Sequence, residues 1–308
     1  MKAQLSVLGV GNFVRRVIGI RLGRLYQYPP RPLTLTKVGT SNESGPLPKV
    51  SLVTPSFNQA QFLGKTIESV LGQGYPDLEY CVQDAGSTDG SAELLRAFKK
   101  SNITVRIERD AGQADALNRG FAGTSGEIMG YLNSDDFFLP GTLHLVGAVF
   151  RDHPEVDVIY GNRLIVDEEG FEIGRWILPG HDQELLRFVD YVPQESMFWR
   201  RRIWEKIGAQ FNEKMQFAMD WELILRFISA GASFKHVPEL VGIFRVHSAQ
   251  KSQANFVANG FGEIDDLRSI YRDPNRGGVA RFLRHARYLY AHRLADADYE
   301  IKLQKMVN

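Results

Sequence analysis

Beyond Lys49, short apolar strands alternate with amphipathic helical patterns, and acidic residues follow several of the strands. The predicted strands are Val50–Phe57, Leu78–Asp84, Ile103–Glu108 and Glu127–Asn133. Such alternation is typical of an α/β fold with a mostly parallel central sheet flanked by helices. Because parallel strands end at one edge of a sheet, we expect Asp84, Asp110 and the pair Asp135–Asp136 to share a crevice. Carboxylates repel an anionic ligand unless a divalent cation lies between them, so the pattern predicts a metal-assisted site for a phosphorylated substrate.

The composition excludes several classes of protein. A chain of 308 residues can bury one large α/β core with a smaller appendage. The 37 Lys and Arg residues balance 36 Asp and Glu residues, so no overall charge attracts nucleic acid, and we expect no nucleic-acid partner. Cys81 is the single cysteine, which excludes an intramolecular disulfide and a multi-cysteine zinc site. These features fit a cytoplasmic protein.

The two ends of the chain differ from its middle. Residues 1–25 interleave apolar side chains with Arg15, Arg16, Arg21 and Arg24. A basic amphipathic segment of this kind can lie on an anionic membrane surface, and the alternative is that its apolar side chains pack on the domain. We therefore expect three parts, which are an N-terminal segment with a linker (1–48), a main domain (49–256) and a helical tail (257–308).

The second half of the main domain has a different pattern. Val156–Asp167 and Glu172–Leu178 predict a hairpin, with the acidic turn Asp167–Gly170 between its strands. From His181 the pattern becomes helical, and Phe234–Val246 is extended.

Several polar side chains at the strand ends could bind a phosphorylated ligand. Pro55 and Asn58 lie where the first strand passes into a helix, and free backbone N–H groups there can receive a phosphate. Gln113 and Asp115 can hydrogen-bond sugar hydroxyls, and Asn118 shares a helix face with Asp115. The oxygens of Asp135 and Asp136 suit a hard cation, either Mg²⁺ or Mn²⁺.

Three motifs in this order resemble the family 2 glycosyltransferases, which have the GT-A fold. They are Thr-Pro-Ser-Phe-Asn at 54–58, Asp-Ala-Gly-Ser-Thr-Asp-Gly at 84–90 and Leu-Asn-Ser-Asp-Asp at 132–136. Each motif is short, but their order and spacing together are specific. The resemblance extends from about Val50 to about Ser252, which is most of the chain.

The resemblance implies roles for the residues that match. Asp84 corresponds to the acid that binds the nucleotide base, and the segment after Asp110 corresponds to the one that holds the ribose and sugar. Asp136, Asp135 and His247 are the implied ligands of the Mn²⁺ or Mg²⁺ that contacts the donor diphosphate. The predicted donor-binding residues are Pro55, Asn58, Asp84, Asp110, Gln113, Asp115, Asn118 and Asp135.

The resemblance also implies a general base and an acceptor side. Asp220 matches the family's base, although Met219 stands where many relatives have Glu, and Glu222 is the alternative base. Asp220 can also cap the helix that follows it. Gln194 and Glu195 match the segment that meets the acceptor.

The sequence thus predicts a metal-dependent, inverting glycosyltransferase. It would move a sugar from a nucleotide-diphosphate donor to a hydroxyl of a glycan or a lipid-linked glycan, in bacterial surface polysaccharide or glycolipid assembly. Its expected location is the cytoplasm, with peripheral contact at the inner face of the membrane through residues 1–25. The alternatives are a nucleotidyltransferase and a non-catalytic protein that binds nucleotide sugar or carbohydrate. The absence of Gly-x-Gly-x-x-Gly after the first strand argues against a dinucleotide-dependent oxidoreductase.

Overall fold

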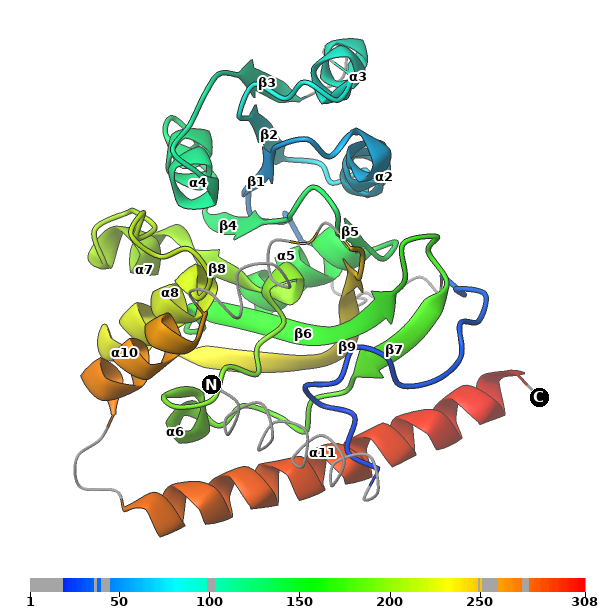
Figure 1. Cartoon of the computed structure of the whole chain (residues 1–308), viewed down its shortest axis with the longest axis vertical. Coiled ribbons are helices and arrows are strands. Elements are labelled where there is room, and N and C mark those ends of the chain that lie inside the picture. The colour runs from blue at the N-terminus through cyan, green and yellow to red at the C-terminus, as the bar shows by residue number, and fades with distance from the viewer. Residues whose placement is uncertain are drawn as a thin grey trace.

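The molecule has an α/β fold, in which one β-sheet carries helices on both faces (Figure 1). The structure is a computed structural model that describes residues 19–35, 38–39, 45–98, 103–248, 250, 260–272 and 277–307. Within these residues the sheet has nine strands in the order β3-β2-β1-β4-β8-β6-β9-β5, and β7 pairs with β6.

The first half of the sheet is parallel, as the alternating pattern predicts. Ser56 lies beside Asp84, and Asp84 lies beside Ile107, so three strands end at one edge. The predicted strands and intervening helices are confirmed, with ends shifted by a few residues at most. These elements are β1 (Val50–Ser56), α2 (Ala60–Leu71), β2 (Leu78–Asp84), α3 (Ser91–Phe98), β3 (Thr104–Ile107), α4 (Gln113–Phe121) and β4 (Ile128–Tyr131).

The second half adds antiparallel strands, so the sheet as a whole is mixed. The predicted hairpin is confirmed as β6 and β7, and β9 runs parallel to β6. The short strand β8, which was not predicted, lies between β4 and β6 and joins the two halves. The elements are β5 (Phe137–Phe138), α5 (Thr142–Asp152), β6 (Val158–Val166), β7 (Glu172–Trp176), α6 (Gln183–Leu186), the 3₁₀ turn η1 (Gln194–Ser196), β8 (Phe198–Arg200), α7 (Arg201–Lys206), α8 (Met219–Ser229), β9 (Phe234–Arg245), α10 (Phe261–Tyr271) and α11 (Gly278–Val307).

The sheet is covered on both faces, which explains its continuous apolar strands. Every residue of β1, β4 and β6 is buried. Successive side chains of a strand point to opposite faces, and accordingly Leu52 and Val53 belong to two different apolar clusters.

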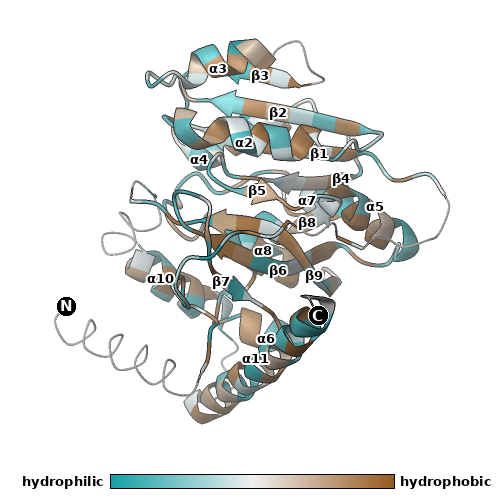
Figure 2. Cartoon of the chain, turned by 90° about the vertical axis from the view of Figure 1, so that its right-hand side faces the viewer, coloured by the Kyte–Doolittle hydropathy of each residue, from teal (hydrophilic) through white to brown (hydrophobic). Residues whose placement is uncertain are grey.

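Both terminal segments pack on this domain. Ile20 and Leu22 are buried in the same cluster as Tyr288 of α11. The described part of the basic N-terminal segment therefore packs on the domain, whereas residues 1–18 lie outside the described residues. Helix α11 lies at the end of the molecule opposite α3 and β3 (Figures 1 and 2). Among the described helices, none is long and apolar enough to cross a membrane.

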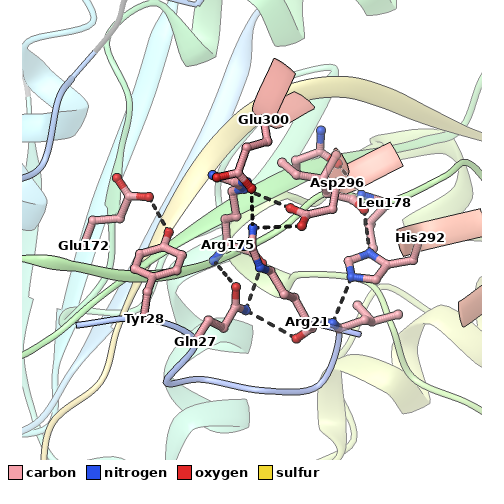
Figure 3. Close-up of polar contacts among 12 residues, drawn as sticks. Arg21, Gln27, Tyr28, Glu172, Arg175, Leu178, His292, Asp296 and Glu300 are labelled. Carbon is pink, nitrogen blue, oxygen red and sulfur yellow. Dashed lines mark hydrogen bonds and ion pairs between the residues drawn. The ribbon is translucent and has the colours of Figure 1, made fainter. Parts of the chain in front are cut away.

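A buried polar network fastens α11 to β7 and to the N-terminal segment (Figure 3). Arg175 of β7 is only 1% exposed, and its guanidinium contacts Asp296 at 2.9 Å and Glu300 at 2.8 Å. Arg21 contacts the other oxygen of Asp296 at 2.8 Å. A buried guanidinium is stable only with such anionic partners, so this network fixes the position of α11.

His292 makes the second connection between these segments. Its Nε2 accepts the Leu22 N–H at 2.9 Å, and its Nδ1 donates to the Ile177 carbonyl at 2.7 Å. These partners require the neutral imidazole with its proton on Nδ1. Burial lowers the pKa of His292, in agreement with a neutral ring.

Asp296→Ala should destabilise the protein by about 2–3 kcal/mol, because it removes a charged hydrogen-bond partner from the buried Arg175. The control is Asp298→Ala, two residues away, since Asp298 is 63% exposed and contacts Lys302 at the surface. The control should change the free energy of unfolding by less than about 1 kcal/mol. Urea unfolding of both variants measures the difference, and equal effects would show that the network does not anchor α11.

Candidate functional site

Asp84 lies at the predicted edge of the sheet, but its carboxylate is fully engaged by the protein. Its Oδ1 accepts the Gly86 and Ser87 N–H groups at 3.1 and 2.8 Å. Its Oδ2 accepts the Ser56 and Ser87 hydroxyls at 2.9 and 2.7 Å, and the residue is wholly buried. Asp84 therefore organises the loop after β2.

Asp110, at the same edge, keeps an acceptor available. Its Oδ1 accepts the Gly112 N–H at 3.0 Å. Its Oδ2 is buried without a hydrogen-bond partner in the part of the chain that the structure describes. Burial raises the pKa of Asp110, and the nearby charges of Asp115 and Asp84 add to this, against the lowering effect of the Gly112 N–H. A ligand hydroxyl or N–H group would satisfy this oxygen.

Asn58 and Pro55 shape the first strand-to-helix junction. Pro55 is buried within β1, and Asn58 is exposed with a left-handed backbone at φ 52°. The Asn58 side-chain oxygen accepts the Thr88 N–H at 3.0 Å, and its own N–H donates to Ser87 Oγ at 2.7 Å. Asn58 thus joins the loops that follow β1 and β2.

The predicted residues of α4 contact three different parts of the site. Gln113 Nε2 donates to Asn133 Oδ1 at 2.7 Å, which connects α4 to the end of β4. Asp115 accepts the Arg119 Nε–H and the Ala111 N–H, each at 2.8 Å, and the Arg119 bond lowers its pKa. Asn118 accepts the Phe211 N–H at 2.7 Å, so it holds the loop before α8.

Asp135 and His247 meet where β4 and β9 end. Asp135 Oδ2 lies 3.0 Å from His247 Nε2, and the buried imidazole lies 4.6 Å from the Phe62 ring. No group of three His, Cys, Asp or Glu side chains able to hold a metal occurs among the described residues. The carboxylate and imidazole nevertheless fit Mn²⁺ or Mg²⁺, which take protein ligands together with water and substrate phosphates.

Asp136 lies behind this pair and is 1% exposed. Its Oδ1 accepts the Arg245 N–H at 3.0 Å, which fixes the end of β9. Burial, with the adjacent charge of Asp135, raises the pKa of Asp136 well above its ordinary value.

Arg245 is a site residue that sequence reasoning missed. Its Nε donates to the Asp135 carbonyl at 3.1 Å, and its guanidinium lies over the Phe62 and Phe137 rings at 4.9 and 5.2 Å. It provides a buried cation beside two acids. Its position two residues before His247, a predicted site residue, could have marked it as part of the site.

A buried ion pair lies at the centre of the site. Glu195, 1% exposed, accepts two hydrogen bonds from Arg163 at 2.8 and 2.6 Å. The Arg163 guanidinium also lies over the Trp176 and Phe244 rings at 4.5 and 4.7 Å. A Cβ at Gly242 would come within 2.5 Å of Glu195 Cγ, so only glycine permits this approach.

Gln194 also makes its hydrogen bonds within the protein. Its side chain accepts from Asn133 at 3.0 Å and donates to the Tyr131 carbonyl at 2.8 Å. Gln194 and Glu195, which were predicted to meet the acceptor, are 7% and 1% exposed, and the hydrogen bonds described here are to other protein groups.

Asp220 and Asp190 form a second acidic group. Asp220 is the second residue of α8 and is partly exposed, and Asp190 precedes η1 and is exposed. Protein atoms around the two carboxyls displace part of their hydration water and thereby raise the pKa of both, and the charge of Asp220 further raises that of Asp190. Arg163 lowers the pKa of both, so they lie within range of the central ion pair. Sequence reasoning missed Asp190, for which no motif gave a signal.

Tyr131 is affected by the charges of several of these acids. Burial, followed by the charges of Asp220, Asp190, Asp136 and Glu195, raises its pKa well above the ordinary value. By contrast, the Glu222 carboxylate is paired with Arg226, whose Nε donates to both of its oxygens at 2.9 and 3.0 Å.

Glu263 of α10 holds the segment that leads into Asp220. Its carboxylate accepts the N–H groups of Gln216, Phe217 and Ala218 at 2.7, 2.9 and 2.9 Å. Three donors at the start of a helix lack helical partners, so one carboxylate satisfies them. Sequence reasoning missed Glu263 because it lies in the tail beyond the recognised motifs.

Comparison with known sequences agrees with this geometry. The family described as "Glycosyl transferase family 2" matches residues 51–226. The O-antigen biosynthesis protein RfbC of Myxococcus xanthus is 30% identical over 197 residues, which are 62% of this chain. The matched region spans only 15% of RfbC.

Solved structures show the same fold. S. aureus TarS in complex with UDP-GlcNAc has a TM-score of 0.61 and 16% identity, over 79% of this chain and 72% of that one. The mannosyltransferase PcManGT of Pyrobaculum calidifontis, in complex with GDP-Man and Mn²⁺, has a TM-score of 0.56 and 19% identity, over 94% and 80%. The predicted GT-A fold is thereby confirmed, and the chain belongs to glycosyl transferase family 2.

Proposed function

We propose that this protein transfers a sugar from a nucleotide-diphosphate donor to an acceptor hydroxyl with inversion at the anomeric carbon. The observation that carries the proposal is the arrangement of two groups around the buried Arg163–Glu195 pair. Asp135 and His247 form one group beside Phe62 of α2, which belongs to the half of the sheet made of β1 to β4 (the donor half), and Asp220 with Asp190 forms the other group. A metal-assisted departure and a base-assisted attack need two such groups.

The donor nucleotide binds at the ends of β1 to β3. The unpartnered Asp110 Oδ2 is the acceptor best placed for a ribose hydroxyl or a base N–H. Asp84, expected to read the base, contributes by holding the loop after β2, because its four hydrogen bonds occupy both oxygens. TarS and PcManGT were solved with UDP-GlcNAc and GDP-Man, so both nucleotides are candidates.

Asp135 and His247 hold the divalent cation, Mn²⁺ or Mg²⁺. Asp136, expected as a ligand, instead positions β9 through the Arg245 N–H. When bound, the cation supplies charge neutralisation to the donor diphosphate. The Mn²⁺ in the PcManGT complex supports this assignment.

Asp220 is the general base. It takes the proton from the acceptor hydroxyl while that oxygen attacks the anomeric carbon from the face opposite the diphosphate. Glu222 is set aside as the base because Arg226 occupies its carboxylate. A single displacement of this kind inverts the configuration.

The acceptor binds beside Asp190, which is exposed next to the base. The similarity to RfbC, an O-antigen biosynthesis protein, favours an acceptor in surface polysaccharide or glycolipid assembly. A lipid-linked glycan at the cytoplasmic face of the membrane fits the basic composition of residues 1–25.

Asp220→Asn should lower turnover by about 10²–10⁴-fold, since a positioned base contributes this much to the rate. Nucleotide affinity should not change, because Asp220 does not bind the donor. Release of nucleoside diphosphate from UDP- and GDP-sugars measures turnover, and calorimetry measures affinity. The exposed Asp265→Asn serves as the control. Full turnover, or loss of donor affinity, would contradict the assignment.

The pH profile should rise with pH, because the base acts only when ionised. A raised pKa of Asp220 places this rise above the ordinary aspartate range. Asp190→Asn removes a neighbouring negative charge, so the rise in kcat/KM should move to lower pH. If the rise in kcat/KM of this variant stays at the same pH or moves to higher pH, the two carboxyls do not interact.

Glu263→Ala should free the three N–H groups before Asp220. Loss of charged hydrogen bonds worth about 1–3 kcal/mol corresponds to about 5- to 150-fold faster amide exchange at residues 216–218. Hydrogen–deuterium exchange measures this, and Asp265→Ala on the same helix is the control. Protection equal to that of the control would rule out the positioning role.

A further inference from the structure

Helix α11 exposes a long apolar stripe on the face that points away from the domain. The stripe recurs at intervals of three, four and seven residues, which places its members on one side of a helix. The opposite side contributes Tyr288, His292 and Asp296 to the buried contacts with the domain. The stripe consists of Val279, Phe282, Leu283, Tyr290, Leu294 and Ile301, which are 74%, 70%, 60%, 62%, 54% and 52% exposed.

Cations border this stripe. Arg287 and Arg293 are exposed beside its middle part, and Lys302 and Lys305 are exposed beside its C-terminal part. Two acids of this face have exposed side chains among the described residues of α11, and both are paired. Lys302 contacts Asp298 at 2.7 Å, and Arg21 and Arg175 contact Glu300 at 3.2 and 2.8 Å. An apolar centre with cationic edges complements an anionic lipid surface, where apolar side chains enter the headgroup boundary and cations meet phosphates. Two copies meeting through this face would bring like charges together.

The N-terminal segment leaves the domain at the same helix. The Leu22 N–H is bonded to His292, and a Cβ at Gly19 would lie 3.8 Å from Arg293 Nε. The described chain thus begins, at Gly19, next to the stripe. The sequence before it combines Arg15 and Arg16 with apolar residues.

We propose that the outer face of α11 docks on an anionic membrane surface. This end lies opposite α3 and β3, so docking leaves the donor half of the sheet directed away from the lipid (Figures 1 and 2). The inference goes beyond the proposed function, because lipid binding is measured without catalysis.

The test measures binding of the full chain to vesicles of phosphatidylcholine with and without phosphatidylglycerol. The variant is Leu283→Gln/Leu294→Gln, which removes two stripe side chains and keeps good helix formers. The control is Leu35→Gln/Phe171→Gln, which removes two apolar side chains, 47% and 45% exposed, outside α11. Circular dichroism checks that the variant folds. Its rate of sugar transfer to a water-soluble acceptor should be unchanged, so a failure of membrane binding can be distinguished from a failure of the proposed function.

We expect the wild type and the control to bind anionic vesicles, less strongly at high salt and weakly without phosphatidylglycerol. The variant should bind at least about tenfold more weakly. Equal binding by variant and wild type would overturn the proposal, as would no binding by the wild type. Loss of all binding on deletion of residues 2–18, with none lost in the variant, would assign the contact to the N-terminal segment alone. A wild-type dimer that becomes monomeric in the variant would make the stripe an interface between copies.

Discussion

The site depends on the buried ion pair between Arg163 and Glu195. Removing two charges from water is costly unless each is fully satisfied, and here two hydrogen bonds and two aromatic faces enclose the guanidinium. Its charge also acts on Asp136, Asp190 and Asp220, whose pKa values it lowers against the effect of burial. One buried cation therefore partly offsets the cost of keeping several nearby carboxylates ionised.

The acids of this site separate into two groups by their hydrogen bonds. Asp84 and Glu222 are held at both oxygens by loop groups or by an arginine, so they maintain structure. Asp110 Oδ2 has no hydrogen-bond partner among the described residues. Asp220 accepts the Trp221 N–H through Oδ1 at 2.9 Å, which leaves Oδ2 for the acceptor proton, and both acids are among those to which we assign ligands. The role of an acidic motif residue thus depends on whether neighbouring protein groups already hydrogen-bond to both of its carboxylate oxygens.

The sequence predicted the parallel half of the sheet well because its strands, each rich in apolar residues, alternate with helical patterns along the chain. It did not predict β8, whose three residues are too few to show a period, although they join both halves. Motif positions predicted Asp220, Asp135 and His247 as site residues, but not Asp190 or Arg163. Arg163 and Glu195 are 32 residues apart, and Glu263 reaches Ala218 across 45 residues, so only the folded chain brings them together.

Calorimetric titration with UDP and GDP, with and without Mn²⁺, is the most direct test of a metal-dependent donor site. We expect at least one of these nucleotides to bind at least about tenfold more tightly with Mn²⁺ than without, and Asp135→Asn to remove this difference. Three results would contradict a donor site built on Asp135 and His247. They are nucleotide binding that does not depend on Mn²⁺, an effect of Mn²⁺ that is unchanged in Asp135→Asn, and no binding of either nucleotide to the folded protein.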